Sequence, residues 1–172
     1  MKIHQLIQGS PEWHAFRKER FTASDAAAML GYSKYKKRDE LIEEKATGIT
    51  PEVTPEQQKR FDRGHETEAL ARTILENEMD EEFYPVTGTH DDQEVIAASL
   101  DGIDMMGTIL FEHKDWKTLV AYIEERKDLP NTHWPQLEQQ LFVSGAQVVK
   151  FVVSDGTVDN RVIFEYYSKP ER

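Results

Sequence analysis

Two carboxylates and a lysine stand close together in "SLDGIDMMGTILFEHKDWK", residues 99–117. Asp101 ends one apolar run, and Glu112 and Lys114 lie in the next with one residue between them. Side chains alternate faces along a strand, so Glu112 and Lys114 share a face, about 6 to 7 Å apart, while His113 points the other way. If the two runs pair as strands, Asp101 lies beside them. The segment therefore predicts an acidic site with one ammonium group, built on a sheet.

Such a group of side chains suits a divalent cation. Neighbouring carboxylates repel each other unless a cation lies between them, and Mg²⁺, with Mn²⁺ as its substitute, prefers oxygen ligands. The expected ligands are Asp101, Glu112 and the backbone carbonyl of His113, and the same carboxylates could hold one metal or two. A metal there would polarise a phosphoryl oxygen while Lys114 orients the attacking water, which is phosphodiester hydrolysis. An isolated E-x-K is more often an exposed ion pair, so the prediction depends on its context.

Composition excludes several kinds of chemistry. The chain has no cysteine, which excludes disulfides, thiolate-bound zinc and iron–sulfur clusters. No apolar run is long enough to cross a membrane, and the start "MKIHQLIQGS" lacks the features of a signal peptide. We therefore expect a cytoplasmic protein with no membrane partner, and the length of 172 residues predicts a single domain over 1–172.

The net charge of −11 argues at first against a nucleic-acid partner, but the charge is unevenly distributed. Residues 1–50 carry nine basic and seven acidic side chains, whereas residues 51–100 carry four and thirteen. The basic groups gather in "FRKERF" and "KYKKR". Such a cluster could hold a polyanion locally, and a solvated surface is the alternative.

Residues 1–50 are predicted to form short helices. Ser10 is a candidate N-cap with Pro11 at the first helical position, and this helix should end near Arg20. A second helix is expected over 21–33, and a third over 37–48.

Residues 54–172 are predicted to contain a sheet between helices. The capping-box pattern at Thr54 begins the longest helix, over 54–79, with Phe61, Ala69, Ala71, Ile74 and Leu75 on one face. Short segments rich in β-branched and aromatic residues then predict strands, and two further helices precede the last two. The expected strands are 81–89, 94–102, 107–114, 147–156 and 161–168; the expected helices are 117–129 and one from about His133 to Gly145.

This order and the D…E-x-K signature resemble the PD-(D/E)XK, or restriction-endonuclease-like, nucleases. Five motifs in sequence resemble, more narrowly, the lambda-type phage exonucleases and the related YqaJ-type viral recombinases. They are "SPEWHAFRKERFTASDAAAMLG", "RGHETEALAR", "SLDGI", "FEHK" and "WPQLEQQLFVSG". The resemblance implies an α/β (α+β) fold with a restriction-endonuclease-like core, a central mixed β-sheet flanked by helices (αβββαβ), preceded by N-terminal helices.

The resemblance also implies a role for several residues. It makes Asp101 and Glu112 metal ligands and Lys114 the residue that acts on the water. Glu68, on the long helix, would be a further acidic group near the metal, and Gln136 would face the same cleft. Taken alone, Glu68 and Gln136 would be read as solvated side chains.

Arg17 and Ser24 match the positions that hold the 5′-phosphate of a DNA end in this family. A hydroxyl and backbone N–H groups at a helix N-terminus, joined by a guanidinium, would form an anion site. The alternative is a solvated Arg17 and a Ser24 that only caps a helix.

The implied function is a Mg²⁺-dependent 5′→3′ exonuclease that degrades one strand of linear double-stranded DNA. Family members of this kind form ring trimers and pass a 3′-ended single strand to an annealing protein in phage-type recombination, so a homo-oligomer and such a partner are expected. The first alternative is a structure-specific or restriction-type endonuclease on the same core. The second is a catalytically idle, nuclease-like module that binds a protein, against which the intact Asp101, Glu112 and Lys114 argue.

Other conspicuous side chains receive structural interpretations. His65, His90 and His133 do not repeat at metal-ligand spacing and are expected to be surface or structural residues. Trp13 and Trp134 lie on apolar helix faces and are expected in the core, with stacking of an aromatic ring near the cleft on a displaced base as the alternative.

Overall fold

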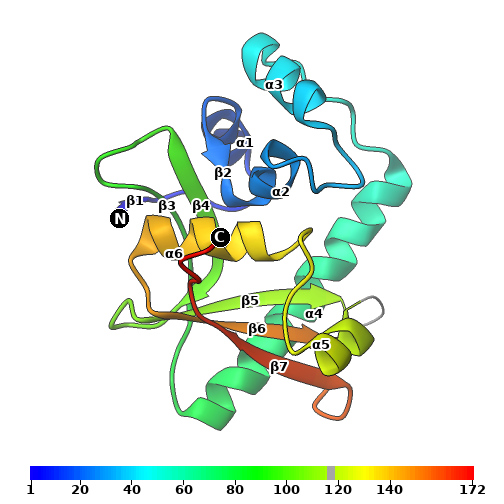
Figure 1. Ribbon diagram of the computed structural model, residues 1–172, viewed down its shortest axis with the longest axis vertical. Helices are drawn as coiled ribbons and strands as arrows, with labels where there is room; N and C mark the ends of the chain where they lie inside the picture. Colours follow the sequence, from blue (N-terminus) through cyan, green and yellow to red (C-terminus); the bar gives the residue numbers. More distant parts are fainter. Residues whose placement is uncertain (116–118) are drawn as a thin grey trace.

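The computed structural model describes residues 1–115 and 119–172 (Figure 1). The three residues that follow Asp115 lie outside the described residues, and so does the beginning of the helix expected over 117–129. The rest of that helix is present and shorter than predicted, because Lys127 takes the left-handed conformation with φ of 52° and ends it.

The described residues form a seven-stranded mixed sheet with the strand order β1-β3-β4-β5-β6-β7, and β2 pairs with β4. The pairs β5–β6 and β2–β4 are parallel, and the others are antiparallel. All five predicted strands are present, and the apolar β6 lies inside the sheet, between β5 and β7. The strands are β1 Lys2–His4, β2 Phe21–Thr22, β3 Tyr84–Thr89, β4 Ile96–Ile103, β5 Ile109–Asp115, β6 Val148–Ser154 and β7 Arg161–Tyr166.

The helices begin and end close to their sequence signals. Ser10 accepts a hydrogen bond from the backbone N of Trp13 and caps the first helix, Thr54 caps the longest, and Gly145, with φ of 75°, ends the last. The helices are α1 Pro11–Lys18, the 3₁₀ turn η1 Ala23–Asp25, α2 Ala26–Met29, α3 Arg38–Thr47, α4 Pro55–Met79, α5 Val120–Arg126 and α6 Trp134–Ser144.

Two predictions about these elements need correction. The helix expected over 21–33 is present only over residues 23–29, as the 3₁₀ turn η1 followed by α2, because Phe21 and Thr22 pair with β4 before η1 begins. The apolar face expected on α4 is buried only at Ala71 and Leu75, while Phe61 is 51% exposed. The first half of α4 is exposed and extends toward α3 (Figure 1).

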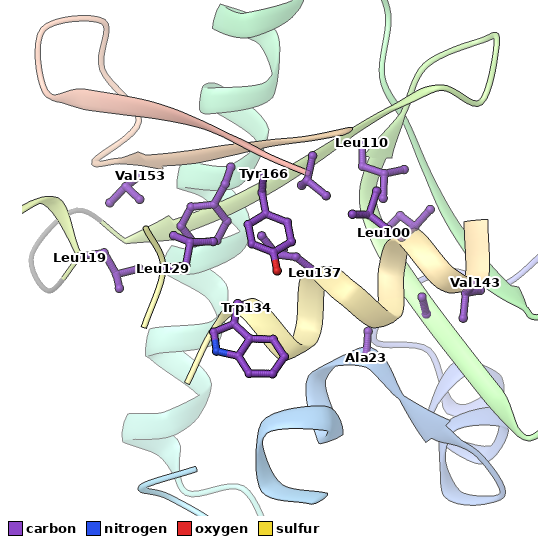
Figure 2. Packing of buried hydrophobic residues seen from close by; sticks show 14 of the residues in the cluster. Ala23, Leu100, Leu110, Leu119, Leu129, Trp134, Leu137, Val143, Val153 and Tyr166 are labelled. Carbon is purple, nitrogen blue, oxygen red and sulfur yellow. The ribbon is translucent and has the colours of Figure 1, made fainter. Parts of the chain in front are cut away.

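Helices cover both faces of the sheet. On one face, α6 packs Leu137 and Leu141 against a cluster that includes Leu110 and Tyr166 (Figure 2). On the other face, Ala71 and Leu75 of α4 form a smaller cluster with Phe83, Phe111 and Val152. Leu110 and Phe111 therefore face opposite layers, as alternation along β5 requires.

Strand β4 carries one extra residue at the position of Asp101. Val86 pairs with Leu100 and Tyr84 with Ile103, so two steps along β3 span three along β4. Such a bulge bends a strand and re-aims its side chains. Here it lies between Leu100, which packs in the α6 layer, and Gly102, which lies against the α4 layer.

A tight turn joins β4 to β5 and fixes their register. The buried carboxylate of Asp104 accepts hydrogen bonds from the backbone N of Thr108 (2.6 Å), the backbone N of Ile109 (2.8 Å) and the hydroxyl of Thr108 (2.8 Å). Gly102 then pairs with Phe111. One more step in this register brings Asp101 opposite Glu112.

No helix within the described residues combines the length and the apolar character that crossing a membrane would require.

Candidate active site

All of the residues predicted for the site line one cleft. Its volume is about 420 Å³, and its walls come from α1, η1, α4, β4, β5 and the first turn of α6. The predicted residues in its lining are Arg17, Ser24, Glu68, Asp101, Glu112, His113, Lys114 and Gln136. Parts of the chain more than a hundred residues apart in sequence therefore meet here.

The alternation predicted for the E-x-K segment is present. The ammonium of Lys114 donates to Oε1 of Glu112, so the two side chains share a face. The ring of His113 points to the other side, where its Nε2 lies 3.1 Å from the hydroxyl of Ser154. Burial lowers the pKa of His113, and the hydrogen bond to the backbone of Ser154 opposes the decrease.

Glu112 is the most enclosed acid of the cleft. Its side chain is 1% exposed, and amides from α6 hold both of its oxygens. Gln136 Nε2 donates to Oε1 (2.6 Å), and Gln140 Nε2 donates to Oε2 (2.7 Å). With Lys114, the carboxylate accepts three hydrogen bonds, which offsets the cost of burying a charge.

Asp101 is held beside Glu112 by the backbone. Its Oδ2 accepts from the backbone N of His113 (3.0 Å), and its carbonyl oxygen accepts from Arg72 of α4 (2.8 Å). Desolvation raises the pKa of Asp101 well above its ordinary value, and the charges of Glu112 and Glu68 add to the rise. Three carboxyl groups thus compete for ionisation in one small volume.

Glu68 faces the cleft from α4, and charged groups of both signs lie near its carboxylate. Burial raises its pKa, while Arg72, 3.7 Å away, opposes the rise. His65 lies 3.9 Å from its carboxylate, which places this histidine at the edge of the cleft.

Lys114 is an ammonium group at neutral pH. Burial alone would lower its pKa, but the carboxylates of Glu112 and Asp101 outweigh burial and raise the pKa. The lysine therefore supplies a fixed positive charge among three acids.

The donor set fits a divalent cation. Asp101, Glu112 and Glu68 supply hard oxygen donors. Burial, and then the charges of neighbouring carboxylates, raise the pKa of Asp101 and Glu68, and a bound cation would favour their ionised forms. Within residues 1–115 and 119–172, no three acidic, histidine or cysteine side chains already converge on one point.

Arg17 and Ser24 are directly bonded to each other. The guanidinium Nη2 donates to the Ser24 hydroxyl (2.7 Å), and the guanidinium plane lies 4.3 Å over the ring of Trp13. The indole N–H of Trp13 donates in turn to Ser99 of β4 (3.0 Å). This chain of contacts fixes the orientation of Arg17 against the sheet.

Sequence reasoning missed three members of the site. Trp13 was expected in the core, yet it lines the cleft, whereas Trp134 is buried as predicted. Gln140 lies four residues after Gln136, and that helical spacing is the signal that could have found it. The contact of Arg72 depends on how α4 crosses β4 and leaves no local signal.

A third glutamine fixes how α6 lies on the sheet. The Nε2 of Gln139 donates to the carbonyl oxygens of Phe21 and Ala97, both at 2.9 Å. These two bonds join α6 to β2 and β4. An adjacent side of the helix then presents Gln136 and Gln140 to Glu112.

Comparison with known proteins finds a matching family and similar solved structures. The family model described as "YqaJ-like viral recombinase domain" matches residues 12–147. An alkaline exonuclease (LHK-Exo) from Laribacter hongkongensis is similar in structure, with a TM-score of 0.74 and 26% identity over 94% of this chain and 84% of that chain. LHK-Exo in complex with dAMP has the same TM-score and coverage at 24% identity. No curated protein matches the sequence.

Proposed function

Because the chain belongs to the YqaJ-like viral recombinase family, we propose that it is a metal-dependent exonuclease acting on linear double-stranded DNA. The proposed direction is 5′→3′, with Mg²⁺ as the ion and Mn²⁺ as its substitute, within a single domain over 1–172. The observation that carries the proposal is the meeting of Asp101, Glu112 and Lys114 with the Arg17–Ser24 pair in one cleft.

The proposed 5′→3′ polarity depends on which end of the DNA strand binds at Arg17 and Ser24. Arg17 and Ser24 offer a guanidinium and a hydroxyl to a terminal 5′-phosphate, and charge-assisted hydrogen bonds of this kind are strong and directional. A 5′-end held there would lay the first phosphodiester of its strand near Asp101 and Glu112.

Side chains of the protein would then bind the metal, orient the water and stabilise charge during phosphodiester hydrolysis. Asp101 and Glu112, with Glu68 nearby, would hold the metal, and a bound divalent ion lowers the pKa of water and neutralises charge on a phosphoryl group. Lys114 holds a positive charge beside the reacting phosphate, orients the attacking water and stabilises charge in the transition state. Gln136 and Gln140 fix the carboxylate of Glu112, and Arg72 fixes the backbone at Asp101.

The similar structure supports a nucleotide product. LHK-Exo is described as an alkaline exonuclease and has been captured with dAMP. By family membership, we further propose that the product is a 3′-ended single strand handed to an annealing protein, and that the enzyme is a homo-oligomer, a ring trimer.

The decisive test follows release of acid-soluble nucleotide from 5′-phosphorylated linear duplex with Mg²⁺. We expect release by the wild type and a loss of about 10²- to 10⁴-fold in Lys114→Ala, the range for a positioned proton-transfer or charged group. Lys59→Ala, on an exposed stretch of α4, serves as the matched control and should cleave as the wild type does. Equal activity in wild type and Lys114→Ala would remove Lys114 from the mechanism.

The same assay separates the proposal from an endonuclease. Covalently closed circular duplex has no 5′-end, so the wild type should leave it intact under conditions that degrade the linear form. Cleavage of both forms at similar rates would favour the endonuclease.

A further inference from the structure

The second basic cluster has no part in the proposed cleavage reaction. The segment "YSKYKKR", residues 32–38, joins α2 to α3 and carries four basic residues and no acidic one, in a chain of net charge −11. A local excess of positive charge on an acidic protein is suited to holding a polyanion.

The loop has a defined conformation. The backbone N groups of Tyr32 and Ser33 both donate to the carbonyl of Ala27, at 2.8 and 3.1 Å. The Ser33 hydroxyl accepts from the backbone N of Tyr35 and of Lys36, both at 3.2 Å. The turn is therefore fixed before any ligand arrives, which lowers the entropy lost on binding.

Most of the loop's positive charge faces solvent. Lys36 pairs with Glu44 at 2.6 Å, and the carboxylate of Glu40 accepts from the backbone N of Lys37 at 2.8 Å. In the part of the chain that the structure describes, the ammonium groups of Lys34 and Lys37 and the guanidinium of Arg38 form no ion pair. Three cationic side chains on five consecutive residues can thus contact successive phosphates.

Aromatic rings accompany these charges. Tyr35 is 99% exposed, and a hollow of about 420 Å³ separates the loop from Tyr122, which is 39% exposed. The hollow also contacts His133, the residue that precedes α6. Gln136, in the first turn of the same helix, lines the active cleft, so the beginning of α6 contributes a residue to the cleft and the residue before α6 contacts the hollow.

We infer that this hollow binds single-stranded DNA, the strand that is left when its complement is degraded in the cleft. Lysines along a groove contact the backbone, and exposed aromatic rings stack on unpaired bases, whose faces are inaccessible in a duplex. The inference rests on the proposed function for the identity of the strand. Lys34, Tyr35 and Tyr122 line the hollow, and Lys37 follows on the same loop.

Fluorescence anisotropy tests the inference without cleavage. The probe is a 12-nucleotide oligothymidylate with a 5′-hydroxyl, which lacks the phosphate proposed for Arg17, and the buffer contains EDTA. Tyr35→Ala should weaken binding about fivefold or more, and Tyr35→Phe should restore it, because stacking needs the ring and not the hydroxyl. Lys34→Ala/Lys37→Ala should also reduce the slope of log affinity against log salt by about 1.4.

Matched controls remove the same groups elsewhere. Tyr167→Ala deletes another exposed tyrosine, and Lys2→Ala/Lys150→Ala deletes two lysines from the sheet. Both should bind the oligothymidylate as the wild type does. A blunt hairpin duplex should bind equally to wild type and Tyr35→Ala.

Two results would overturn the inference. One is an unchanged affinity of Tyr35→Ala for oligothymidylate. The other is a double lysine variant whose affinity decreases equally for oligothymidylate and for duplex, because the lysines would then contact the backbone of duplex DNA. The cleavage assay is independent of this one. Tyr35-dependent binding in a protein that degrades no DNA would remove the exonuclease proposal and leave the single-strand site in place.

Discussion

At the scale of single residues, the acids of the cation site reduce the stability of the folded protein when no cation is bound. Asp101, Glu112 and Glu68 crowd one cleft, and their mutual repulsion adds to the desolvation that raises the pKa of Asp101. Lys114 and two amides from α6 offset part of that cost at Glu112. Stability and activity should therefore respond in opposite directions to the loss of one acid.

Asp101→Asn should abolish cleavage and stabilise the metal-free protein. The amide oxygen can still accept from the backbone N of His113, while the charge that Glu112 and Glu68 repel is removed. A carboxyl whose pKa is raised by folding makes the folded protein less stable as pH increases from the ordinary pKa of the group to the raised one. The stability difference between Asp101→Asn and the wild type should therefore grow with pH over this range. Urea unfolding in EDTA at a series of pH values measures this, and a variant less stable than wild type at every pH would contradict it.

Arg17→Ala should weaken recognition of the DNA end and leave the metal ligands intact. The wild type should prefer 5′-phosphorylated over 5′-hydroxyl duplex, and the variant should lose about tenfold or more of that preference, as expected for a hydrogen bond to a charged group. Competition between the two substrates in one reaction measures the preference. Arg126→Ala, exposed at the end of α5, is the control, and an unchanged preference in Arg17→Ala would remove Arg17 from the pocket.

At the scale of elements, β4 determines where the acids lie. Its extra residue falls at Asp101, and the next residue has no room for a side chain. A Cβ at Gly102 would lie 2.7 Å from the Cβ of Phe83 and 3.3 Å from that of Phe111. The close approach lets β4, β5 and the start of β3 pack without a gap beside the site.

Gly102→Ala should therefore destabilise the fold by about 1–3 kcal/mol, the usual cost of overpacking a core. Gly64→Ala is the matched control: a Cβ there meets nothing within 4 Å, and alanine in place of glycine inside α4 should stabilise by about 0.5–1 kcal/mol. Thermal unfolding of both variants gives the comparison. A Gly102→Ala protein as stable as the wild type would show that Phe83 and Phe111 can move apart.

Sequence patterns predicted the long helix, the five longer strands and the shared face of Glu112 and Lys114, because each depends on local periodicity. They did not predict β1 and β2, which are short and exist only through pairing with β3 and β4. They also missed the bulge at Asp101 and the contacts of Gln140 and Arg72, since these depend on how separate elements pack.

At the scale of the whole molecule, an acidic protein presents its positive charge in few places. Residues 51–100 carry thirteen of the acidic side chains, whereas the basic clusters of residues 1–50 lie at Arg17 and on the loop 32–38. Arg17 lines the cleft, and Lys34 of the loop lines the hollow. A polyanion repelled by most of the surface would thus be directed toward the cleft and the hollow.

Acid should unfold the molecule partly through His133. Burial, and then the charge of Lys114, lower the pKa of His133 to about 4. A histidine kept neutral by folding contributes stability above pH 6.5 that is lost as pH falls toward 4, about 2 kcal/mol by pH 5. Between pH 7 and pH 5, the free energy of unfolding measured in urea should therefore decrease by about 2 kcal/mol less for His133→Gln than for the wild type.

His14→Gln, at an exposed position of α1, is the control for the acid experiment and should follow the wild type. Identical pH dependence in wild type and His133→Gln would mean that another group accounts for acid unfolding.

The turn at Asp104 sets a limit on how this chain can change in length. Ten residues separate Asp101 from Glu112, and the register of β4 and β5 brings the two acids face to face. Inserting or deleting one residue in that interval would turn Glu112 and Lys114 to the opposite face of the sheet. The loop between β6 and β7 has no such constraint, since no member of the cleft follows it. Among natural and engineered variants, length differences should therefore accumulate after Ser154 and be absent between Asp101 and Glu112.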